Sequence, residues 1–527
     1  MILLYHNLSI QMKKTTFLVL LGILAISIFF RFYNIKETPS GLYPDEAVNG
    51  VNALDALANK NWKVFYPENY GREGLFMNLQ SISVNYFGAY PWALRIVSGI
   101  FGVLTVLGLF LLTRVLWGDR IALLSSYLMA ISFWAVNFSR IGFRAIMLPF
   151  VLVWAFYFFW SGILKNSKFL IIISGLFYGL GFHTYIAWRL SPLLIIFIFL
   201  ILLIKKDYDK KFVLKSLVWF SIAGFIVMAP LAIYYLNNIP DFFGRASDVS
   251  IFKSASPVKA FAESAIKTLG MFNVYGDANW RHNLSGRPEL FWPFGISFII
   301  GLAIVIKHFR SDRNLFLLSW FFVMLLPNFL APEGTPHALR ALGAMPAVFI
   351  LSAIGLNSFY EKVQSKLNNS LKNSNSQNIT KRIQRIKKEF SYLCLLGLVL
   401  CGVWEFRTYF IVWANKIQVI DNFETRLTHI ADYLNGLDSN TKKYVIVNET
   451  GAIIKGVSIQ AQPIMFLASK QDINYLNPNE IDSIPLYLTD ATIVLTKYDK
   501  ELFKKIMANY PNAHEANLIT FRAIRIQ

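Results

Sequence analysis

Charged residues and cysteines are both scarce in this chain of 527 residues. Only 16% of the residues are charged and 55% are hydrophobic, whereas a soluble domain usually carries about 25% charged residues. This composition excludes a disordered chain, a small disulfide-rich scaffold and an ordinary cytosolic enzyme. Cys394 and Cys401 are seven residues apart in one apolar run, about 10 Å along a helix and beyond the reach of a disulfide. We therefore expect no cysteine metal site and a protein that lies mostly in a bilayer.

Apolar runs of the length that a membrane helix requires, about 20 residues, recur as far as residue 413. The candidates are 15–33, 92–113, 121–137, 145–164, 169–187, 190–204, 213–236, 290–306, 314–331, 338–358 and 391–413. The pattern predicts an all-α polytopic membrane protein with about eleven transmembrane helices. The run 190–204 is short and 290–306 is weakly apolar, so ten to thirteen spans remain possible.

Basic residues gather in alternate loops between these runs. Lys13 and Lys14 precede the first run, and the loops that share their side are all basic. The richest of these loops holds Lys362, Lys366, Lys372, Lys381, Arg382, Arg385, Lys387 and Lys388. The positive-inside rule places these loops and the N-terminus in the cytoplasm. The net charge of +20 therefore reflects topology, and we expect a multi-pass cell-membrane protein with an uncleaved first span and no nucleic-acid partner.

The polarity of the chain changes after residue 413. Residues 414–527 carry twelve Lys+Arg and twelve Asp+Glu, and short apolar runs alternate there with helical patterns, which predicts a small α/β domain. By span parity this domain lies outside the cytoplasm. We divide the chain into a transmembrane domain, 1–413, and an extracytoplasmic domain, 414–527. The first contains the outer loop 34–91 and a solvated, partly flexible cytoplasmic linker, 359–390.

Arginine is disfavoured in outer loops, yet six arginines lie at the outer ends of predicted spans. They are Arg72, Arg95, Arg140, Arg144, Arg189 and Arg340. Ionisable groups at membrane depth are costly and usually face a cavity and a partner. An arginine cluster suits a phosphate, because each guanidinium group offers bidentate charge-assisted hydrogen bonds. For any one arginine, snorkelling to the interface is the ordinary alternative.

The first outer loop carries the most informative carboxylates. Asp45 and Glu46 follow Pro44 at the start of a helical pattern over 46–58, and a second apolar helix is predicted over 75–87. We expect both helices to lie along the membrane interface as amphipathic helices. Asp45 could simply cap its helix, but a capping role does not exclude chemistry. Adjacent residues on a helix diverge by about 100°, so Asp45 and Glu46 are not a facing pair.

At these residues the sequence resembles the GT-C glycosyltransferases, in particular the protein O-mannosyltransferase, aminoarabinose transferase and lipopolysaccharide galacturonosyltransferase-like group. Asp45 and Glu46, the following Tyr70-Gly71-Arg72, and segments 139–144 and 336–340 carry the resemblance, which covers roughly 40–350. It implies a GT-C fold and a polyprenyl-phosphate-linked sugar donor used outside the cytoplasm. It also implies that Asp45 is the base or acceptor-orienting carboxylate and that Arg72 contacts the lipid phosphate. Several members carry a second acidic residue where this chain has Arg140 and Arg144, which argues against a metal ion bridging two carboxylates.

We therefore predict an inverting hexosyl or pentosyl transferase with a lipid, protein or glycan acceptor. A good phosphate leaving group needs no general acid, so one carboxylate can deprotonate the acceptor while cations stabilise the developing charge. Asp45 is the predicted base and Glu46 its support. Donor-phosphate and substrate contacts are predicted for Arg72, Glu73, Arg140, Arg144, His183, Tyr185, Arg189, His337 and Arg340. We expect no cofactor. His183 and His337 are equally consistent with hydrogen-bonded residues between helices. No close ligand spacing supports a metal site that they would form with Glu73.

The outer loop 237–288 is either a lid or binding element or a plain surface loop. Its composition, which would suit stacking on a sugar, includes Asp241, Arg245, Asp248, Asp277, Trp280, Arg281, His282 and Arg287. Two other functions remain open. A transporter or flippase of a lipid-linked or anionic substrate would place ionisable groups near mid-bilayer in broken helices, whereas here they gather on one side. A non-catalytic scaffold would not need so many spans.

Overall fold

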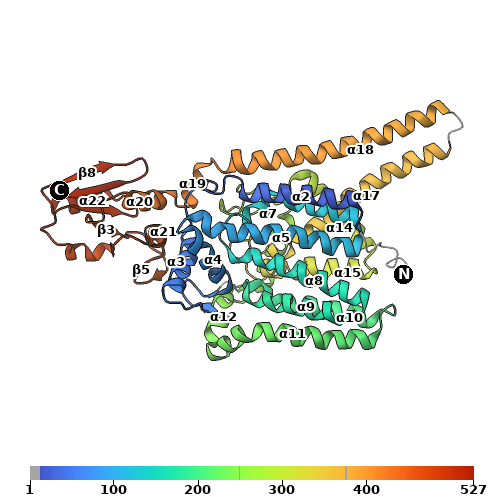
Figure 1. Ribbon diagram of the computed structural model, residues 1–527, viewed down its shortest axis with the longest axis horizontal. Coiled ribbons are helices and arrows are strands. Elements are labelled where there is room, and N and C mark those ends of the chain that lie inside the picture. Colours follow the sequence, from blue (N-terminus) through green and yellow to red (C-terminus); the bar gives the residue numbers. More distant parts are fainter. Residues whose placement is uncertain (1–11, 249, 374–376, 527) are drawn as a thin grey trace.

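The computed structural model describes residues 12–248, 250–373 and 377–526. A helical bundle forms most of the molecule, and a small domain with a β-sheet is attached to one end of it (Figure 1). The first turns of α2 (Lys14–Phe32) and the adjoining ends of α17 (Met345–Lys372) and α18 (Gln377–Phe406) lie at the other end. The loops that the sequence analysis assigns to the cytoplasm are thus remote from the C-terminal domain.

Each of the eleven predicted apolar runs coincides with a helix. The helices are α2 Lys14–Phe32, α5 Pro91–Trp117, α6 Asp119–Ile131, α8 Met147–Lys165, α9 Lys168–Leu180, α10 Ser191–Ile204, α11 Lys210–Asn237, α14 Trp292–Lys307, α15 Asp312–Val323, α17 Met345–Lys372 and α18 Gln377–Phe406. Among the described residues, seven helical segments are long and apolar enough to cross a membrane, and Lys168–His183 and Trp292–Lys307 are shorter apolar helices. The chain is therefore a multi-pass membrane protein by length and composition.

Small residues let the central helices approach closely. A Cβ added at Gly301 of α14 would lie 1.8 Å from the Leu351 carbonyl oxygen of α17, and one at Gly355 would lie 1.9 Å from the Ser297 carbonyl oxygen. Gly175 of α9 meets the Phe220 carbonyl oxygen of α11 in the same way. Close backbone contact of this kind is the usual means of helix association where lipid supplies no hydrophobic drive.

The described residues of 359–390 are helical, a local structure that the sequence analysis does not predict for this linker. Helix α17 continues to Lys372 and α18 already begins at Gln377, so the basic residues lie on a helical hairpin that extends beyond the bundle (Figure 1). Lysine, arginine and glutamine are good helix formers, which explains why a polar, solvated stretch still forms helix.

The C-terminal domain is built on a mixed five-stranded sheet with the order β6-β3-β7-β9-β8. Its strands are β3 Lys442–Ile446, β6 Ile473–Leu476, β7 Ala491–Leu495, β8 Ala513–Asn517 and β9 Arg522–Ile526. Strand β3 pairs in parallel with β6 and β7, while β9 is antiparallel to β7 and β8. Separate apolar clusters, one including α20 (Thr425–Asn435) and the other including α22 (Lys500–Ala508), pack against the sheet.

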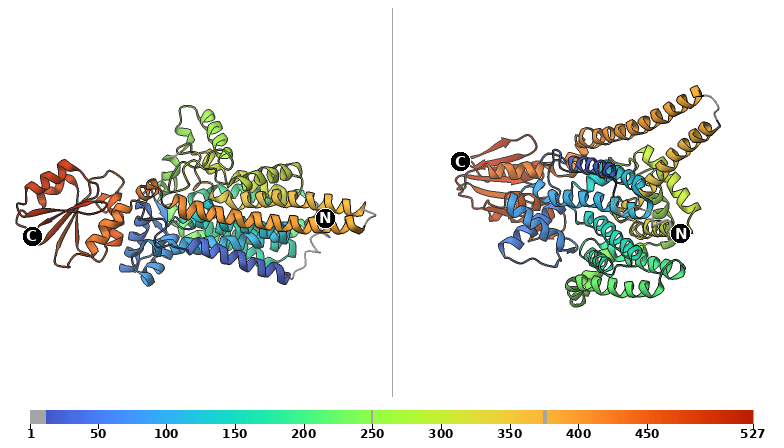
Figure 2. Two further views of the ribbon diagram at one scale, coloured as in Figure 1. Left: turned by 90° about the horizontal axis from the view of Figure 1, so that it is seen from above. Right: turned by 45° about the vertical axis from the view of Figure 1, so that its right-hand side comes forward.

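The first outer loop folds into two helices and a hairpin between the bundle and this domain (Figure 2). Helix α3 spans Pro44–Ala58 and α4 spans Leu75–Phe87, with β1 (Phe65–Tyr66) and β2 (Arg72–Glu73) paired between them. Most of α3 is buried, because α4 and α21 (Gln462–Leu467) pack on it. Helix α3 is therefore enclosed in protein, contrary to the expected amphipathic helix at the lipid surface.

Gly50 of α3 is the point of closest approach to the C-terminal domain. A Cβ at this residue would lie 2.6 Å from the Phe466 ring of α21. We expect Gly50→Leu to lower the free energy of unfolding by about 1–3 kcal/mol, the usual cost of overpacking. Thermal unfolding of the detergent-purified protein measures this change. Gly22→Leu is the matched control, since nothing lies within 4 Å of its added Cβ; equal effects of the two substitutions would contradict the contact.

Candidate active site

A cavity of about 340 Å³ lies where the first outer loop meets the bundle. Its wall is shared by five parts of the chain that are far apart in sequence. The lining includes Tyr43, Asp45, Asn49, Asn69, Arg72, Glu73, Arg144, Tyr185, Arg189, Asp241, Asn279, Arg281, His282 and His337. Seven residues predicted to form the site are therefore brought together: Asp45, Arg72, Glu73, Arg144, Tyr185, Arg189 and His337.

Asp45 lies in the first turn of α3, which begins at Pro44. Proline suits this position because it has no N–H to leave unpaired, and the helix N-terminus favours a negative charge. The Asn69 side-chain amide donates a hydrogen bond to the Asp45 carboxylate. Burial and the neighbouring Asp45 charge raise the pKa of Tyr43 to about 12, and this phenol also interacts with Arg281. These contacts fix the orientation of the Asp45 carboxylate at the cavity wall.

Glu46 points elsewhere. Its carboxylate is fully buried, accepts a hydrogen bond from Arg95 Nε at 3.0 Å and another from the Gly142 backbone N–H at 2.8 Å. Arg95 also donates to the carbonyl oxygens of Pro39 and Gly41. Glu46, predicted to support Asp45, therefore does not line the cavity with it, and neither does Arg95. The angular separation of adjacent helix residues accounts for this.

Arg72 lies on the hairpin strand β2 and faces α3. It donates hydrogen bonds to the side-chain oxygens of Asn49 and Asn52, each at 2.6 Å. These two residues are three positions apart and so share one face of the helix. Burial, with a smaller effect of the nearby Arg144 charge, lowers the pKa of Arg72 to about 10, so the side chain remains cationic at neutral pH.

Glu73 connects two further arginines of the cavity wall. Its carboxylate accepts a hydrogen bond from Arg144 Nε at 2.7 Å and lies 3.7 Å from a terminal nitrogen of Arg189. Arg144 is 5.7 Å from the centre of the Tyr185 ring, and Arg189 donates to the Tyr235 hydroxyl at 3.0 Å. Four arginines face three carboxylates in the lining, counting Arg281 and Asp241, so the cavity has an excess of guanidinium groups.

Three predicted binding residues lie outside the lining. Arg140 is buried and donates to the backbone carbonyl oxygens of Phe30, Arg31 and Thr38. His183 Nε2 lies 2.8 Å from the Val227 carbonyl oxygen. Arg340 donates to the carbonyl oxygens of Ala331 and Glu333. These contacts join backbone segments, so the predicted substrate contacts of Arg140, His183 and Arg340 are not found at this cavity.

Further lining residues come from the outer loop 237–288, for which the sequence predicts a lid, a binding element or a plain surface loop. Asn279, Arg281 and His282 line the cavity, and Arg281 lies 3.7 Å from the centre of the Tyr43 ring. Behind them lies the buried Asp277. Its carboxylate accepts a hydrogen bond from the Ala338 backbone N–H at 2.8 Å and lies 2.8 Å from His282 Nδ1. The many polar and aromatic residues of this loop indicate that it could bind a ligand, but composition does not show which side chains point into the cavity.

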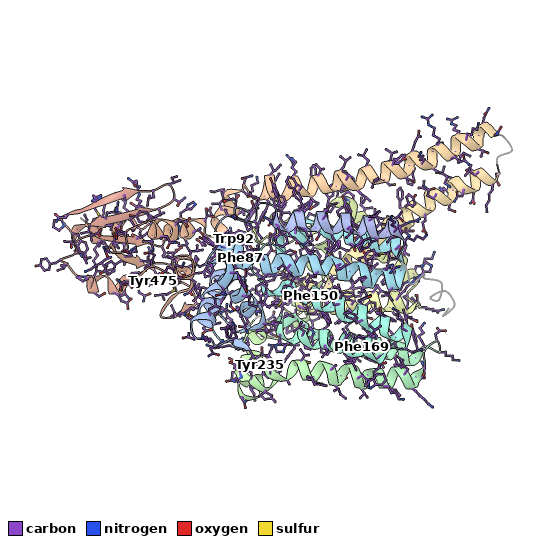
Figure 3. All side chains as sticks on the ribbon, viewed as in Figure 1. Phe87, Trp92, Phe150, Phe169, Tyr235 and Tyr475 are labelled. Atoms are coloured by element: carbon purple, nitrogen blue, oxygen red, sulfur yellow. The ribbon has the colours of Figure 1, made fainter. Side chains whose placement is uncertain are left out.

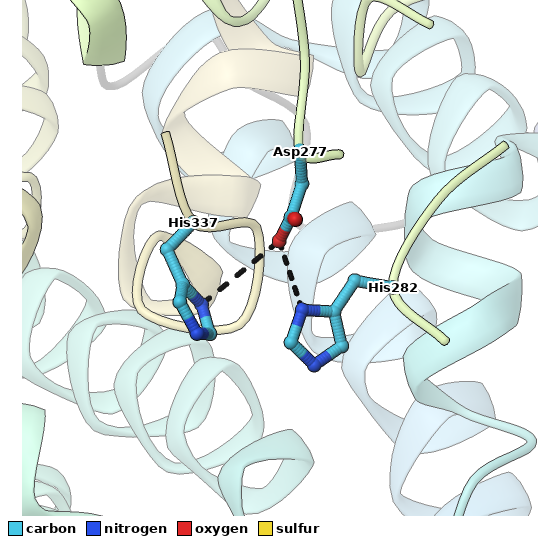
Figure 4. Close-up of side chains that lie close together, drawn as sticks. All are labelled: Asp277, His282 and His337. Carbon is cyan, nitrogen blue, oxygen red and sulfur yellow. Dashed lines mark hydrogen bonds and ion pairs between the residues drawn. The ribbon is translucent and has the colours of Figure 1, made fainter. Parts of the chain in front are cut away.

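Asp277, His282 and His337 form a compact group (Figure 4). One ligand atom from each lies within 4.8 Å of the others, and His337 Nδ1 is buried without a hydrogen-bond partner. Burial and the nearby His282 lower the pKa of His337 well below its usual range, which keeps the imidazole neutral. Neutral imidazole and carboxylate are the donors that Zn²⁺ takes. These three residues could hold a divalent cation, a possibility that the sequence analysis did not identify.

The cavity combines a fixed carboxylate with several guanidinium groups. The carboxylate can accept a proton from a substrate hydroxyl, and the guanidinium groups can stabilise negative charge on a phosphate. The arrangement therefore suits transfer of a group from a phosphate leaving group to a hydroxyl acceptor.

Known proteins share both sequence and fold with this chain. The family described as dolichyl-phosphate-mannose-protein mannosyltransferase matches residues 75–234. The putative mannosyltransferase YkcB of Bacillus subtilis (strain 168) is 26% identical over 191 residues. That match covers 35% of this chain and 26% of YkcB, so the chain spans about a quarter of the length of this curated relative.

Two solved structures have the same fold at low sequence identity. ArnT from Cupriavidus metallidurans, bound to undecaprenyl phosphate, superimposes with a TM-score of 0.63 at 12% identity, covering 97% of this chain and 98% of ArnT. The archaeal oligosaccharyltransferase AglB from Archaeoglobus fulgidus, in complex with an inhibitory peptide and a dolichol-phosphate, gives 0.53 at 14% identity, covering 86% and 64%. The fold of this chain is therefore that of ArnT and AglB, and its residues 75–234 resemble the mannosyltransferase family.

Proposed function

We propose that this chain moves a sugar from a polyprenyl-phosphate donor to an acceptor hydroxyl on the extracytoplasmic side of the cell membrane. The observation that carries the proposal is the shared cavity: Asp45 and the arginines at 72, 144 and 189 line it although they come from separate parts of the chain. The undecaprenyl phosphate bound to ArnT and the dolichol-phosphate bound to AglB support a lipid-phosphate donor.

In the proposed reaction the acceptor oxygen attacks the anomeric carbon of the donor sugar. The bond from that carbon to the phosphate oxygen breaks as the new glycosidic bond forms, and the configuration inverts. Asp45 takes the proton of the acceptor hydroxyl. The polyprenyl phosphate leaves as an anion, and the guanidinium groups stabilise its charge. This scheme assigns no step to a metal ion.

The orientation of the molecule supports the extracytoplasmic assignment. The cavity lies near α3 and the C-terminal domain, whereas the basic hairpin of α17 and α18 lies at the opposite end of the bundle. If the positive-inside rule holds here, the cavity and residues 414–527 face away from the cytoplasm.

Purified protein incubated with radiolabelled polyprenyl-phosphate sugars tests the proposal. We expect label to move to an acceptor fraction from membranes of the source cells, with release of polyprenyl phosphate in equal amount. A protein that moves the intact labelled lipid between leaflets of a vesicle without cleaving it would instead be a flippase, which contradicts the proposal.

Arg72 is expected to act on the donor. Removal of a charge-assisted hydrogen bond costs about 1.5–3 kcal/mol, so Arg72→Ala should raise the KM for the lipid-phosphate donor by roughly 10- to 100-fold. The KM for the acceptor should change little. Steady-state kinetics with each substrate varied in turn measure both constants.

A control variant distinguishes binding of the donor phosphate by Arg72 from the contact of Arg72 with α3. Asn52→Ala removes one of the two partners through which Arg72 holds α3 but leaves the charge in place. An increase in donor KM as large as that of Arg72→Ala would show that Arg72 acts only through the fold, and an unchanged donor KM in Arg72→Ala would contradict phosphate binding.

A further inference from the structure

A second cavity, of about 540 Å³, lies between the bundle and the C-terminal domain. Residues Lys36, Glu37, Ser40 and Gly41 line it together with Tyr90, Pro91 and Trp92, and Thr425, Thr428, His429 and Asp432 line it from α20. Figure 3 shows Trp92 near this junction of the two domains. Ligand sites occur preferentially at such domain interfaces, in cavities of roughly 300–1,000 Å³.

The segment 36–45 separates the two cavities. Ser40 and Gly41 line the second cavity, whereas Tyr43 and Asp45 line the first, and no residue lines both. Arg95 holds this segment in place through the carbonyl oxygens of Pro39 and Gly41. The segment that carries the proposed base, Asp45, therefore also forms part of the wall of the second cavity.

The two cavities differ in charge. The first has an excess of arginine, which suits a phosphate. In the second, the carboxylates of Glu37 and Asp432 outnumber the cationic Lys36, and His429 and the hydroxyl groups of Ser40, Tyr90, Thr425 and Thr428 complete the polar lining. This lining has no excess of cations for a phosphate, and its carboxylates and hydroxyl groups can hydrogen-bond to a ligand with many hydroxyl groups.

Aromatic rings supply an apolar surface beside these polar groups. The rings of Tyr90 and Trp92 are stacked, with centroids 5.9 Å apart and planes at 14°. The Lys36 ammonium group lies 5.4 Å from the centre of the Trp92 ring, and Tyr90, at 54% exposed, is the more open ring of the two. The hydroxyl of a tyrosine and the N–H of a tryptophan add polar contacts at the edges of such a surface. Flat apolar rings next to carboxylate and hydroxyl groups match a sugar ring, which has an apolar C–H face and a polar rim.

We propose that the second cavity binds the uncharged glycan part of the acceptor. This inference rests on the proposed function, because it assigns the donor to the first cavity and the acceptor to the second. Trp92 and Asp432 are the residues expected to matter most, Trp92 because its ring forms the stack with the exposed Tyr90 and Asp432 through hydrogen bonds to hydroxyl groups.

Saturation-transfer NMR on the full-length protein in detergent tests this inference. The probes are the methyl glycosides of mannose, galactose and N-acetylglucosamine and the corresponding disaccharides. We expect saturation transfer to at least one probe with the wild-type protein. The apparent affinity should fall roughly tenfold or more in Trp92→Ala and in Asp432→Asn, since each variant loses a direct contact.

Two further variants serve as controls. Asp45→Asn should still bind the saccharide, because Asp45 does not line this cavity, and so should Tyr487→Ala, whose side chain is 97% exposed elsewhere in the C-terminal domain. Asp432→Asn is nearly isosteric and lies at an exposed position of α20, so loss of binding in it does not reflect misfolding. Absence of saturation transfer to every probe, or wild-type affinity in both Trp92→Ala and Asp432→Asn, would overturn the inference.

A thermal-shift measurement with undecaprenyl phosphate separates the two proposals. If the lipid phosphate stabilises the protein but no saccharide binds the second cavity, only the acceptor inference fails. If the lipid phosphate itself has no effect, the proposed function fails as well.

Discussion

Asp45→Asn should leave the protein folded in the membrane while sugar transfer falls by roughly 10²- to 10⁴-fold, the usual contribution of a general base. The amide keeps the shape of the carboxylate but cannot take a proton. Its neighbours Asn69 and Tyr43 can still hydrogen-bond to the side-chain oxygen. Transfer of labelled sugar, measured at saturating donor, reports the loss in kcat.

Asp55→Asn is the matched control for this substitution. Asp55 lies on the same helix, but its side chain is 43% exposed and forms an ion pair with Lys455 of the C-terminal domain. Exposed ion pairs contribute about 0–1 kcal/mol, so activity should stay close to that of the wild type. Normal turnover in Asp45→Asn, or an equal loss in Asp55→Asn, would remove Asp45 from its assigned role.

The second large effect is expected on stability rather than on chemistry. Arg95→Leu leaves the fully buried Glu46 carboxylate without its ion-pair partner and removes the bonds to Pro39 and Gly41. Breaking a buried pair by removing one partner typically costs about 3–5 kcal/mol. Thermal unfolding of the purified protein should therefore occur at a clearly lower temperature.

A double substitution distinguishes the ion pair from a catalytic role of Glu46. Replacement of both partners, as in Glu46→Gln with Arg95→Met, should recover part of the lost stability, because no unpaired charge then remains buried. If Glu46→Gln alone unfolds like the wild type yet has no transfer activity, Glu46 takes part in the reaction and the structural assignment is wrong.

The sequence was sufficient to predict the helices of the bundle and a good part of the cavity. Long apolar runs are a local property, and all eleven fall on helices. Asp45 and Arg189 could be placed at the same membrane level because charge in a span is costly wherever it occurs. This rule gives the depth of a residue along the bundle but not the direction of its side chain.

The orientation of the side chains explains why some residues predicted for the site do not line the cavity. Glu46 and Arg140 lie at the predicted level, but each faces neighbouring backbone rather than the cavity, which only the packing of α2, α5 and α3 decides. Arg281 and His282 belong to a loop without hydrophobic periodicity, so no pattern connected them with Asp45. The polar composition of 359–390 predicts a solvated linker, but the helix propensity of its lysine, arginine and glutamine residues is enough to form helix up to Lys372 and from Gln377.

The central claim is that the arginine-lined cavity beside Asp45 holds the phosphate of a lipid donor. A cryo-electron microscopy map of the protein with bound undecaprenyl phosphate tests it most directly. We predict phosphate density within about 3–4 Å of the guanidinium groups of Arg72, Arg144 or Arg189, with Asp45 facing the space beside it. Phosphate density bound at another part of the protein, with this cavity ordered and empty, would contradict the account.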